Sequence, residues 1–367
     1  MAEVPMSKKI WVGALATSAC VVAGGAAYIM YQSRRQRCKR RVGRVTAITV
    51  YPVKGIGGIS LPAATLDKHG MMYDRNWMLI RVRNHEFLTQ RQVARLCLLR
   101  THFEDEDGKV ITDGTHFHRA AYLCVSTTEN MANLRVPVAA GSKGKAGGEQ
   151  EYLVKVWASE VRVGDAGDAA AVWMSKYCRE EVRLVRILDS SHRPLNKYYA
   201  PRAGFNGDET DAIQPALSDG YPLHLTTEES LAFLNTKLSD PVPMDRFRAN
   251  IVVSADEGPW QEDGWAELLL GSDTRCFSVK PCDRCVVPTI DQQTATLNRA
   301  IQPTKTLKQI HGVHEDGGKT KSGFFGQNLV HTRAGDVIRV GDAVTVLRYM
   351  DKRLTSQFKG ASPMYAG

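Results

Sequence analysis

The stretch that decides the fold is Lys280-Pro281-Cys282-Asp283-Arg284-Cys285-Val286-Val287-Pro288-Thr289-Ile290-Asp291. Two cysteines stand three positions apart with an arginine between them, and a thiolate is the side-chain ligand that thiophilic metals prefer. A thioredoxin-type redox pair would open a helix, whose N-terminus lowers the thiol pKa. Here Pro281 precedes the pair, and the β-branched residues after it are typical of a strand or an extended loop.

The remaining six cysteines of the chain form no second pair with this spacing. A structural zinc site needs four ligands, and so does an iron–sulfur cluster. The two cysteines of this pair are too few for either one. Two interpretations therefore remain for Cys282 and Cys285. Either one of them is a reactive thiolate on a loop between strands, or both are inert buried cysteines.

A second cluster of chemically informative residues precedes this stretch. Residues 247–254 are rich in β-branched side chains and predict a strand, whose period of two places Arg248 and Asn250 on one face, with Arg246 beside them. Arginines and an amide are poor core residues, but they suit an anionic ligand that accepts hydrogen bonds.

A glycine-rich turn follows an early predicted strand at residues 42–53. Lys54-Gly55-Ile56-Gly57-Gly58 lacks the spacing of a dinucleotide fingerprint, and no helix pattern follows it. Such a turn can still offer backbone N–H groups and one cation to a phosphate, or it is a plain turn.

Taken together, these motifs resemble the MOSC domain proteins that bind molybdenum cofactor, and in particular the mitochondrial amidoxime-reducing components. The resemblance runs from about residue 44 to about residue 347. It is carried by these segments in order: Tyr51-Pro52-Val53-Lys54, Asp74-Arg75-Asn76-Trp77, Phe247-Arg248-Ala249-Asn250, Cys282-Asp283-Arg284-Cys285 and Phe325-Gly326-Gln327-Asn328.

The resemblance implies a role for each of these residues. Cys285 would be the catalytic residue and the one protein ligand of molybdenum, and Cys282 would not be a ligand. Cofactor binding would fall to Lys54, Arg75 and Arg248 through phosphate or pterin contacts, to Asn250 through pterin hydrogen bonds, to the backbone around Gly55, Gly220, Tyr221, Asp283 and Arg284, and to Asn328 over the metal side. Relatives often have serine where this chain has Gly55, and some have Thr-Ser in place of Gly220-Tyr221, so only backbone roles carry over there.

The implied cofactor is molybdenum-molybdopterin, and the implied reaction is the reduction of N-hydroxylated compounds such as amidoximes, hydroxylamines and N-oxides, with nitrite as a further substrate. No motif for NADH or flavin is present, so the expected electron donors are cytochrome b5 and NADH-cytochrome b5 reductase. Two alternatives are a carrier of cofactor sulfur and a cofactor-binding module without turnover. A sulfurase would need a pyridoxal-phosphate domain, which does not fit in 367 residues.

The N-terminus predicts a membrane anchor. Residues 10–33 carry no charge and would span about 36 Å as a helix, against roughly 30 Å of hydrocarbon. Six Lys and Arg at 34–41 outnumber the two at 8–9, which favours an uncleaved anchor over a signal peptide and leaves the catalytic domain facing the cytosol. The family resemblance implies that the anchor lies in the outer mitochondrial membrane, with the peroxisome as an alternative location. Scattered cysteines suit a reducing compartment.

The net charge of +9 is concentrated at this end of the chain. Residues 1–44 hold nine Lys and Arg against one Glu, so the other 323 residues carry only +1, and a nucleic-acid partner is not expected. We expect a mainly β fold with some α (α+β). The predicted divisions are an anchor with its basic flank (1–41), a β-rich MOSC N-terminal domain (42–192), a MOSC β-barrel domain (193–349) and a tail (350–367).

Several local elements can also be predicted. Strands are expected at 77–82, 94–103, 120–126, 152–157 and 182–188. A helix is expected near 169–177 with Asp165 or Asp168 as its cap, and another at 230–238 with a capping box of Thr226 and Glu229. His116 and His118 alternate as on a strand, but they lack a third metal ligand and are expected on the surface.

Overall fold

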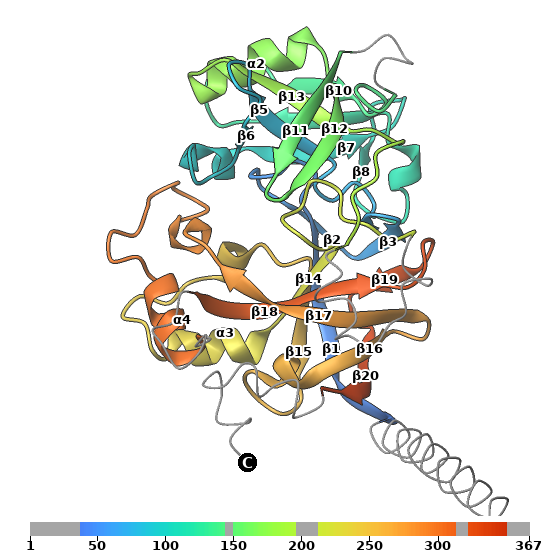
Figure 1. Ribbon diagram of the computed structural model, residues 1–367, viewed down its shortest axis with the longest axis vertical. Helices are drawn as coiled ribbons and strands as arrows, with labels where there is room; N and C mark the ends of the chain where they lie inside the picture. Colours follow the sequence, from blue (N-terminus) through green and yellow to red (C-terminus); the bar gives the residue numbers. More distant parts are fainter. Residues whose placement is uncertain (1–36, 144–149, 196–211, 313–321, 351–367) are drawn as a thin grey trace, which may run out of the picture.

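The computed structural model describes residues 37–143, 150–195, 212–312 and 322–350, and in these ranges the protein is mainly β, as predicted. Two lobes are stacked along the long axis (Figure 1). The predicted anchor helix lies outside the described residues, and so does nearly all of the predicted tail. Within those ranges, no helix combines the length and the apolar character that crossing a bilayer requires.

The lower lobe in Figure 1 is a sheet that closes on itself. Its order is β15-β14-β18-β17-β16-β20-β1, and β1 pairs back onto β15, with β2 added alongside β1. The strands are β1 (Arg37–Val50), β2 (Ile59–Leu61), β14 (Leu223–Thr227), β15 (Ile251–Ala255), β16 (Trp265–Leu270), β17 (Thr274–Arg284), β18 (Gly323–His331) and β20 (Ala343–Tyr349). The predicted barrel is therefore present.

Alternating burial explains why these segments close into a barrel. In β20, Val344 and Val346 are fully buried while their neighbours are partly exposed, so one face points into the core. β18 is buried almost throughout because α4 (Thr304–Ile310) packs against it. Helix α3 (Glu228–Asn235) contacts β14 and β15.

The upper lobe contains two smaller sheets, with helix α2 at its far end (Figure 1). One sheet has the order β11-β12-β13-β5-β6 and the other β10-β9-β7-β8, and α2 packs on β13. The elements are β5 (Trp77–Arg81), β6 (Phe87–Leu88), β7 (Arg100–Glu104), β8 (Val110–Ile111), β9 (Tyr122–Ser126), β10 (Leu134–Pro137), β11 (Glu151–Val156), β12 (Ser159–Asp165), α2 (Asp168–Cys178) and β13 (Val182–Ile187).

Strands from the N-terminal half also belong to the lower lobe. β1 pairs with β15 and β20, so the basic flank from Arg37 onward is strand backbone rather than a linker. β3 (Ala63–Asp67) pairs with β4 (Gly70–Met71) and with β19 (Val337–Arg339). The domain limits at 42, 193 and 350 stay predictions.

Two predicted local elements are wrong in detail. Residues 94–98 form a 3-10 helix, η1 (Ala94–Leu98), and only the second half of that predicted strand is extended, because Leu96 and Cys97 turn into the core. His116 and His118 flank and enter the 3-10 helix η2 (Phe117–Arg119) instead of alternating on a strand, although both are exposed as expected.

The predicted helix caps are also displaced. Gly167 rather than an aspartate occupies the N-cap of α2, and Asp165 instead binds Arg183. The N-cap of α3 is Thr227, whose hydroxyl accepts from the Ser230 N–H, while Glu229 bonds the backbone of Ala255. Tertiary partners for the two carboxylates therefore override the local capping pattern.

Candidate functional site

A cavity of about 140 Å³ is lined by turns next to β5 and β6 of the upper lobe and by segments in or beside β14, β15, β17 and β18 of the barrel. Ten of the eleven residues that the sequence pointed to as cofactor contacts line it, and Asp283 is the exception. The full lining is Lys54, Gly55, Arg75, Thr89, Gln90, Arg91, Ser218, Asp219, Gly220, Tyr221, Leu223, His224, Phe247, Arg248, Asn250, Cys282, Arg284, Cys285, Val287 and Asn328. The structure thus brings together segments more than 270 residues apart.

The two cysteines reach the cavity from the end of β17. Register shifts beside Lys280 and beside Pro281 accommodate the proline, so the strand continues through Cys282 and ends at Arg284. Cys285 follows directly, and the predicted extended exit is instead a 3-10 turn, η8 (Val287–Thr289). That turn aims the Val287 N–H at Cys285 Sγ, at 3.4 Å.

Cys282 and Cys285 have different surroundings. Arg284 Nη1 donates to Cys282 Sγ at 2.9 Å, and burial raises the pKa of the Cys282 thiol, an effect that Arg284 partly opposes. Arg284 Nη2 donates to the Phe247 carbonyl, but its Nε is buried without a hydrogen-bond partner among the described residues. The sequence did not anticipate that Cys282 would line the same cavity.

Lys54 is fixed by the loop opposite the cysteines. Its side chain is only 7% exposed, and Nζ donates to the Leu217 carbonyl at 2.9 Å and to Asp219 Oδ1 at 2.5 Å. Burial lowers the pKa of the Lys54 ammonium, and the Asp219 carboxylate works against that shift. Asp219 also accepts from Trp157 Nε1 at 3.0 Å. Its carboxylate therefore connects its own loop with Lys54 and with Trp157.

A buried network supports the opposite wall. Asp74 accepts from Arg75 Nη1 at 2.5 Å and from Asn250 Nδ2 at 3.0 Å, and burial raises its pKa against the effect of Arg75. Asn250 also donates to the Thr49 carbonyl and accepts from the His224 N–H. The side-chain amide of Asn250 is therefore already hydrogen-bonded within the protein, and its role is to hold this wall of the cavity in place.

Arg248 is the least constrained cation of the cavity. Its guanidinium lies over the Tyr51 ring, at 4.3 Å from the centroid, and it hydrogen-bonds to none of the described residues. Burial lowers the pKa of Arg248 to about 10. Such a donor fork, held by stacking but without an acceptor, is suited to an anion.

The expected strand around Arg248 is wrong. Residues 244–247 form the 3-10 helix η6 (Met244–Phe247), Arg248 adopts the left-handed conformation with φ 52°, and β15 begins only at Ile251. Arg248 and Asn250 therefore reach the cavity from a tight turn, while Arg246 leaves it and pairs with Asp291 at 2.6 Å. Arg75, at φ 51°, is a second left-handed arginine in the lining, and such strain often accompanies functional sites.

Three of the positions predicted to contact the cofactor through their backbone, Gly55, Gly220 and Asp283, have different surroundings. Gly55 has φ 90°, and a Cβ there would lie 3.2 Å from the Thr89 backbone, so glycine is required. A Cβ on Gly220 would meet nothing within 4 Å, which leaves room for a ligand in front of that backbone. Asp283 instead points away and pairs with Lys280 at 2.8 Å.

Sequence reasoning missed several lining residues. His224 on β14 is buried, and burial followed by the Arg284 charge lowers its pKa to about 3, so it is neutral at pH 7. Arg91 lies 3.7 Å from Asp219, and its Nε is buried with no hydrogen-bond partner among the described residues. The one sequence feature that could have indicated these lining residues was the high density of polar residues at 89–91 and 218–220. Ordinary surface turns have the same composition.

The lining is strongly cationic. Five cations face a single carboxylate, that of Asp219, and the five are Lys54, Arg75, Arg91, Arg248 and Arg284. Two sulfur atoms stand at one side of the same cavity. This donor set fits a ligand that combines a phosphate or another anion with a thiophilic metal.

Comparisons with known proteins identify the family of the chain. The MOSC N-terminal beta barrel domain matches residues 42–181, and the MOSC domain matches residues 214–345. The chain is 30% identical to the mitochondrial amidoxime reducing component 2 of Rattus norvegicus, over 92% of this chain and 93% of the relative. It is 28% identical to the mitochondrial amidoxime-reducing component 1 of Homo sapiens, over 93% and 94%.

A more distant match is the molybdenum cofactor sulfurase of Oryza sativa subsp. japonica, which is 29% identical over 71% of this chain but only 30% of the sulfurase. Both MOSC domains are therefore present in this chain. The chain belongs to the MOSC-domain family of mitochondrial amidoxime reducing components.

Proposed function

We propose that the chain is a molybdenum-cofactor-dependent reductase of N-hydroxylated compounds, with Cys285 as the protein ligand of the metal. The observation that carries the proposal is the meeting of Cys285 with five cations around one cavity. The names of the rat and human relatives refer to amidoxime reduction, and the name of the rice relative refers to molybdenum cofactor. Both support the same assignment.

The cavity residues fit molybdopterin. The Arg248 guanidinium has no acceptor among the described residues, the buried Nε atoms of Arg284 and Arg91 lack partners in the same ranges, and the space before Gly220 is open. Arg248 and Arg75 would bind phosphate or pterin oxygens through charge-assisted hydrogen bonds. Lys54 would add positive charge while it holds the Asp219 loop.

Molybdopterin, when bound with its metal, would supply two-electron oxygen-atom-transfer chemistry at molybdenum. Overall, the substrate N–O bond is cleaved, two electrons and two protons are consumed, and water is released. Within the chain, Cys285 Sγ would hold the metal, fixed by the turn that directs the Val287 N–H at it. The Asp74–Asn250 network would keep the cationic wall in place.

The electrons would come from cytochrome b5 and NADH-cytochrome b5 reductase, and the chain would act at the outer mitochondrial membrane with this cavity facing the cytosol. Mitochondrial relatives support the organelle, and the apolar stretch at residues 10–33 supports an anchor. Small N-hydroxylated compounds are the substrates in this proposal.

The test combines metal analysis with turnover. Purified full chain is analysed for molybdenum per chain and then assayed for benzamidoxime reduction with cytochrome b5, its reductase and NADH. We expect Cys285→Ala and Cys285→Ser to abolish turnover, whereas Cys178→Ala, at a buried cysteine on α2 in the upper lobe, keeps it. Full activity in either Cys285 variant would refute the ligand assignment.

The same experiment separates the alternatives. A sulfur carrier or a binding module would contain molybdenum but would reduce no benzamidoxime. A chain without molybdenum in its purified, active form would contradict all three interpretations.

A further inference from the structure

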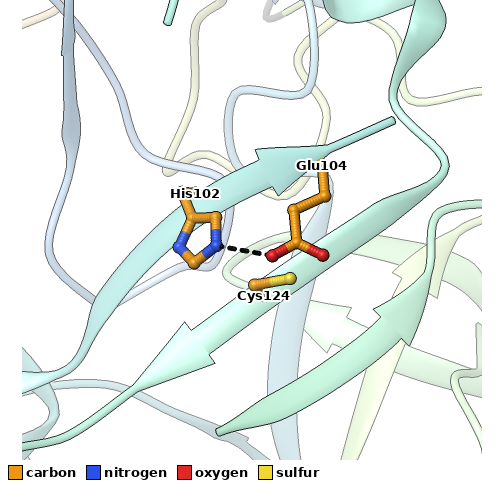
Figure 2. A group of neighbouring side chains, drawn as sticks. All are labelled: His102, Glu104 and Cys124. Carbon is orange, nitrogen blue, oxygen red and sulfur yellow. Dashed lines mark hydrogen bonds and ion pairs between the residues drawn. The ribbon is translucent and has the colours of Figure 1, made fainter. Parts of the chain in front are cut away.

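A second cluster of metal-ligating side chains lies in the upper lobe, on the sheet β10-β9-β7-β8. His102 and Glu104 stand two residues apart on β7 and therefore point to the same face. Cys124 on β9 is the direct cross-strand partner of His102. Figure 2 shows all three side chains converging between the two strands.

The three donor atoms are already close together. His102 Nε2 lies 3.1 Å from Glu104 Oε1, and one donor atom from each residue falls within 4.8 Å of the other two. Tetrahedral zinc with bonds of about 2.0–2.3 Å needs donors roughly 3.3–3.7 Å apart. Small side-chain rotations therefore suffice to surround an ion.

Arg135 on β10 holds the carboxylate from the other side. Its Nε donates to Glu104 Oε2 at 2.9 Å, while Glu104 Oε1 faces His102. Its side chain also hydrogen-bonds to the Cys124 thiol, and its guanidinium lies over the Tyr122 ring. A hydrogen bond of this kind orients a ligating carboxylate. Its positive charge also weakens cation binding, so the affinity should be below that of a four-ligand structural site.

We propose that His102, Glu104 and Cys124 form a binding site for one thiophilic divalent cation, zinc being the best match. One nitrogen, one oxygen and one sulfur suit zinc, whereas magnesium and calcium prefer oxygen ligands only. Three protein ligands leave a fourth position for water, and His102 is 30% exposed, so the ion can enter and leave. The site is independent of the molybdenum cavity, whose lining shares none of these residues.

Cys124 is only 3% exposed, so an ion must reach its sulfur past neighbouring side chains and displace the thiol proton, which lowers the affinity further. We expect an exchangeable ion rather than one on which folding depends.

The test is zinc binding by the chelator-treated full chain, both unaltered and carrying Cys282→Ser and Cys285→Ser, so that the cavity thiols cannot contribute. Zinc affinity is measured by competition with a chromophoric chelator. We expect one site whose affinity falls at least about tenfold in His102→Ala and in Cys124→Ala. His118→Ala and Cys178→Ala, an exposed histidine and a buried cysteine elsewhere, are the matched controls and should leave it unchanged.

Cobalt supplies an independent readout, because a thiolate ligand gives a sulfur-to-cobalt charge-transfer absorption that Cys124→Ala should remove. His102 is half-buried, so its alanine variant should fold, and equal melting temperatures would verify this. Zinc affinity and cobalt spectra that are the same in His102→Ala, Cys124→Ala and the controls would overturn the proposal, as would the absence of stoichiometric zinc.

Discussion

Replacing Arg248 by methionine separates cofactor binding from folding. The guanidinium stacks on Tyr51 and hydrogen-bonds to none of the described residues, so the variant leaves no buried acceptor among them without its donor. The lost stacking is worth about 0.5–1 kcal/mol. Removing a buried charge, whose pKa burial has lowered to about 10, offsets part of this cost. We expect the free energy of unfolding to change by no more than about 1 kcal/mol.

The effect on cofactor binding should be larger. A charge-assisted hydrogen bond contributes about 1.5–3 kcal/mol, which corresponds to a roughly 10- to 150-fold weaker cofactor affinity. The measurement is molybdenum and phosphorus per chain after extensive dilution and gel filtration, beside the melting temperature of the same sample.

Arg95→Met is the control. Arg95 lies over the Tyr177 ring at 4.3 Å, as Arg248 does over Tyr51, and it is not part of the cavity lining. It also donates to the Tyr177 carbonyl at 2.9 Å and pairs with Glu129, so this variant loses more contacts within the protein than Arg248→Met does. This control should retain cofactor. Equal cofactor retention in Arg248→Met and the unaltered chain would refute the assignment of Arg248 as an anion-binding residue.

Three further substitutions test other parts of the structure. Lys54→Ala removes a buried cation and the anchor of Asp219, so molybdenum per chain should fall, and an unchanged content would contradict its role. Phe325→Ala deletes a fully buried ring stacked on Phe247 and should cost about 3–5 kcal/mol in denaturant unfolding. His331 is fully buried with its pKa lowered to about 4, so the unfolded chain takes up its proton first, and stability is lost as pH falls from about 6.5 towards 4. His331→Gln should therefore reduce the stability loss between pH 7 and pH 5 by about 2 kcal/mol, and an identical pH profile would exclude this proton uptake.

The fold class was predictable because its signals are local. Alternation in segments such as 343–349 marks strands with one buried face, and turn residues separate them. The cavity residues within the short motifs were predicted from the resemblance to a known family, not from local signals of this kind.

What the sequence could not indicate depends on contacts between distant segments. The β-branched run at 251–253 extends smoothly back to Phe247, so nothing local reveals that Arg248 lies in a left-handed turn. Asp165 is a good capping residue by type, but Arg183, on the neighbouring strand, binds its carboxylate instead. His224 is one polar residue in an apolar strand, and only the tertiary arrangement, with β14 between β15 and β18, makes it part of the cavity.

The distribution of charge around the cavity links its structure to its proposed use. Five cations face the Asp219 carboxylate in the lining, and Asp74, outside the lining, pairs with Arg75 alone among them. The remaining cations repel one another, and burial lowers the pKa values of Lys54 and Arg248, so this cluster of charge destabilises the folded chain. These cations are not needed for core packing, because none of them belongs to the apolar clusters that form the cores of the two lobes. An anion that binds only the folded state would relieve the repulsion and stabilise the chain by mass action. The same cations that make the cavity costly to fold would therefore make it selective for an anionic cofactor, with the Cys285 sulfur adding the preference for a thiophilic metal.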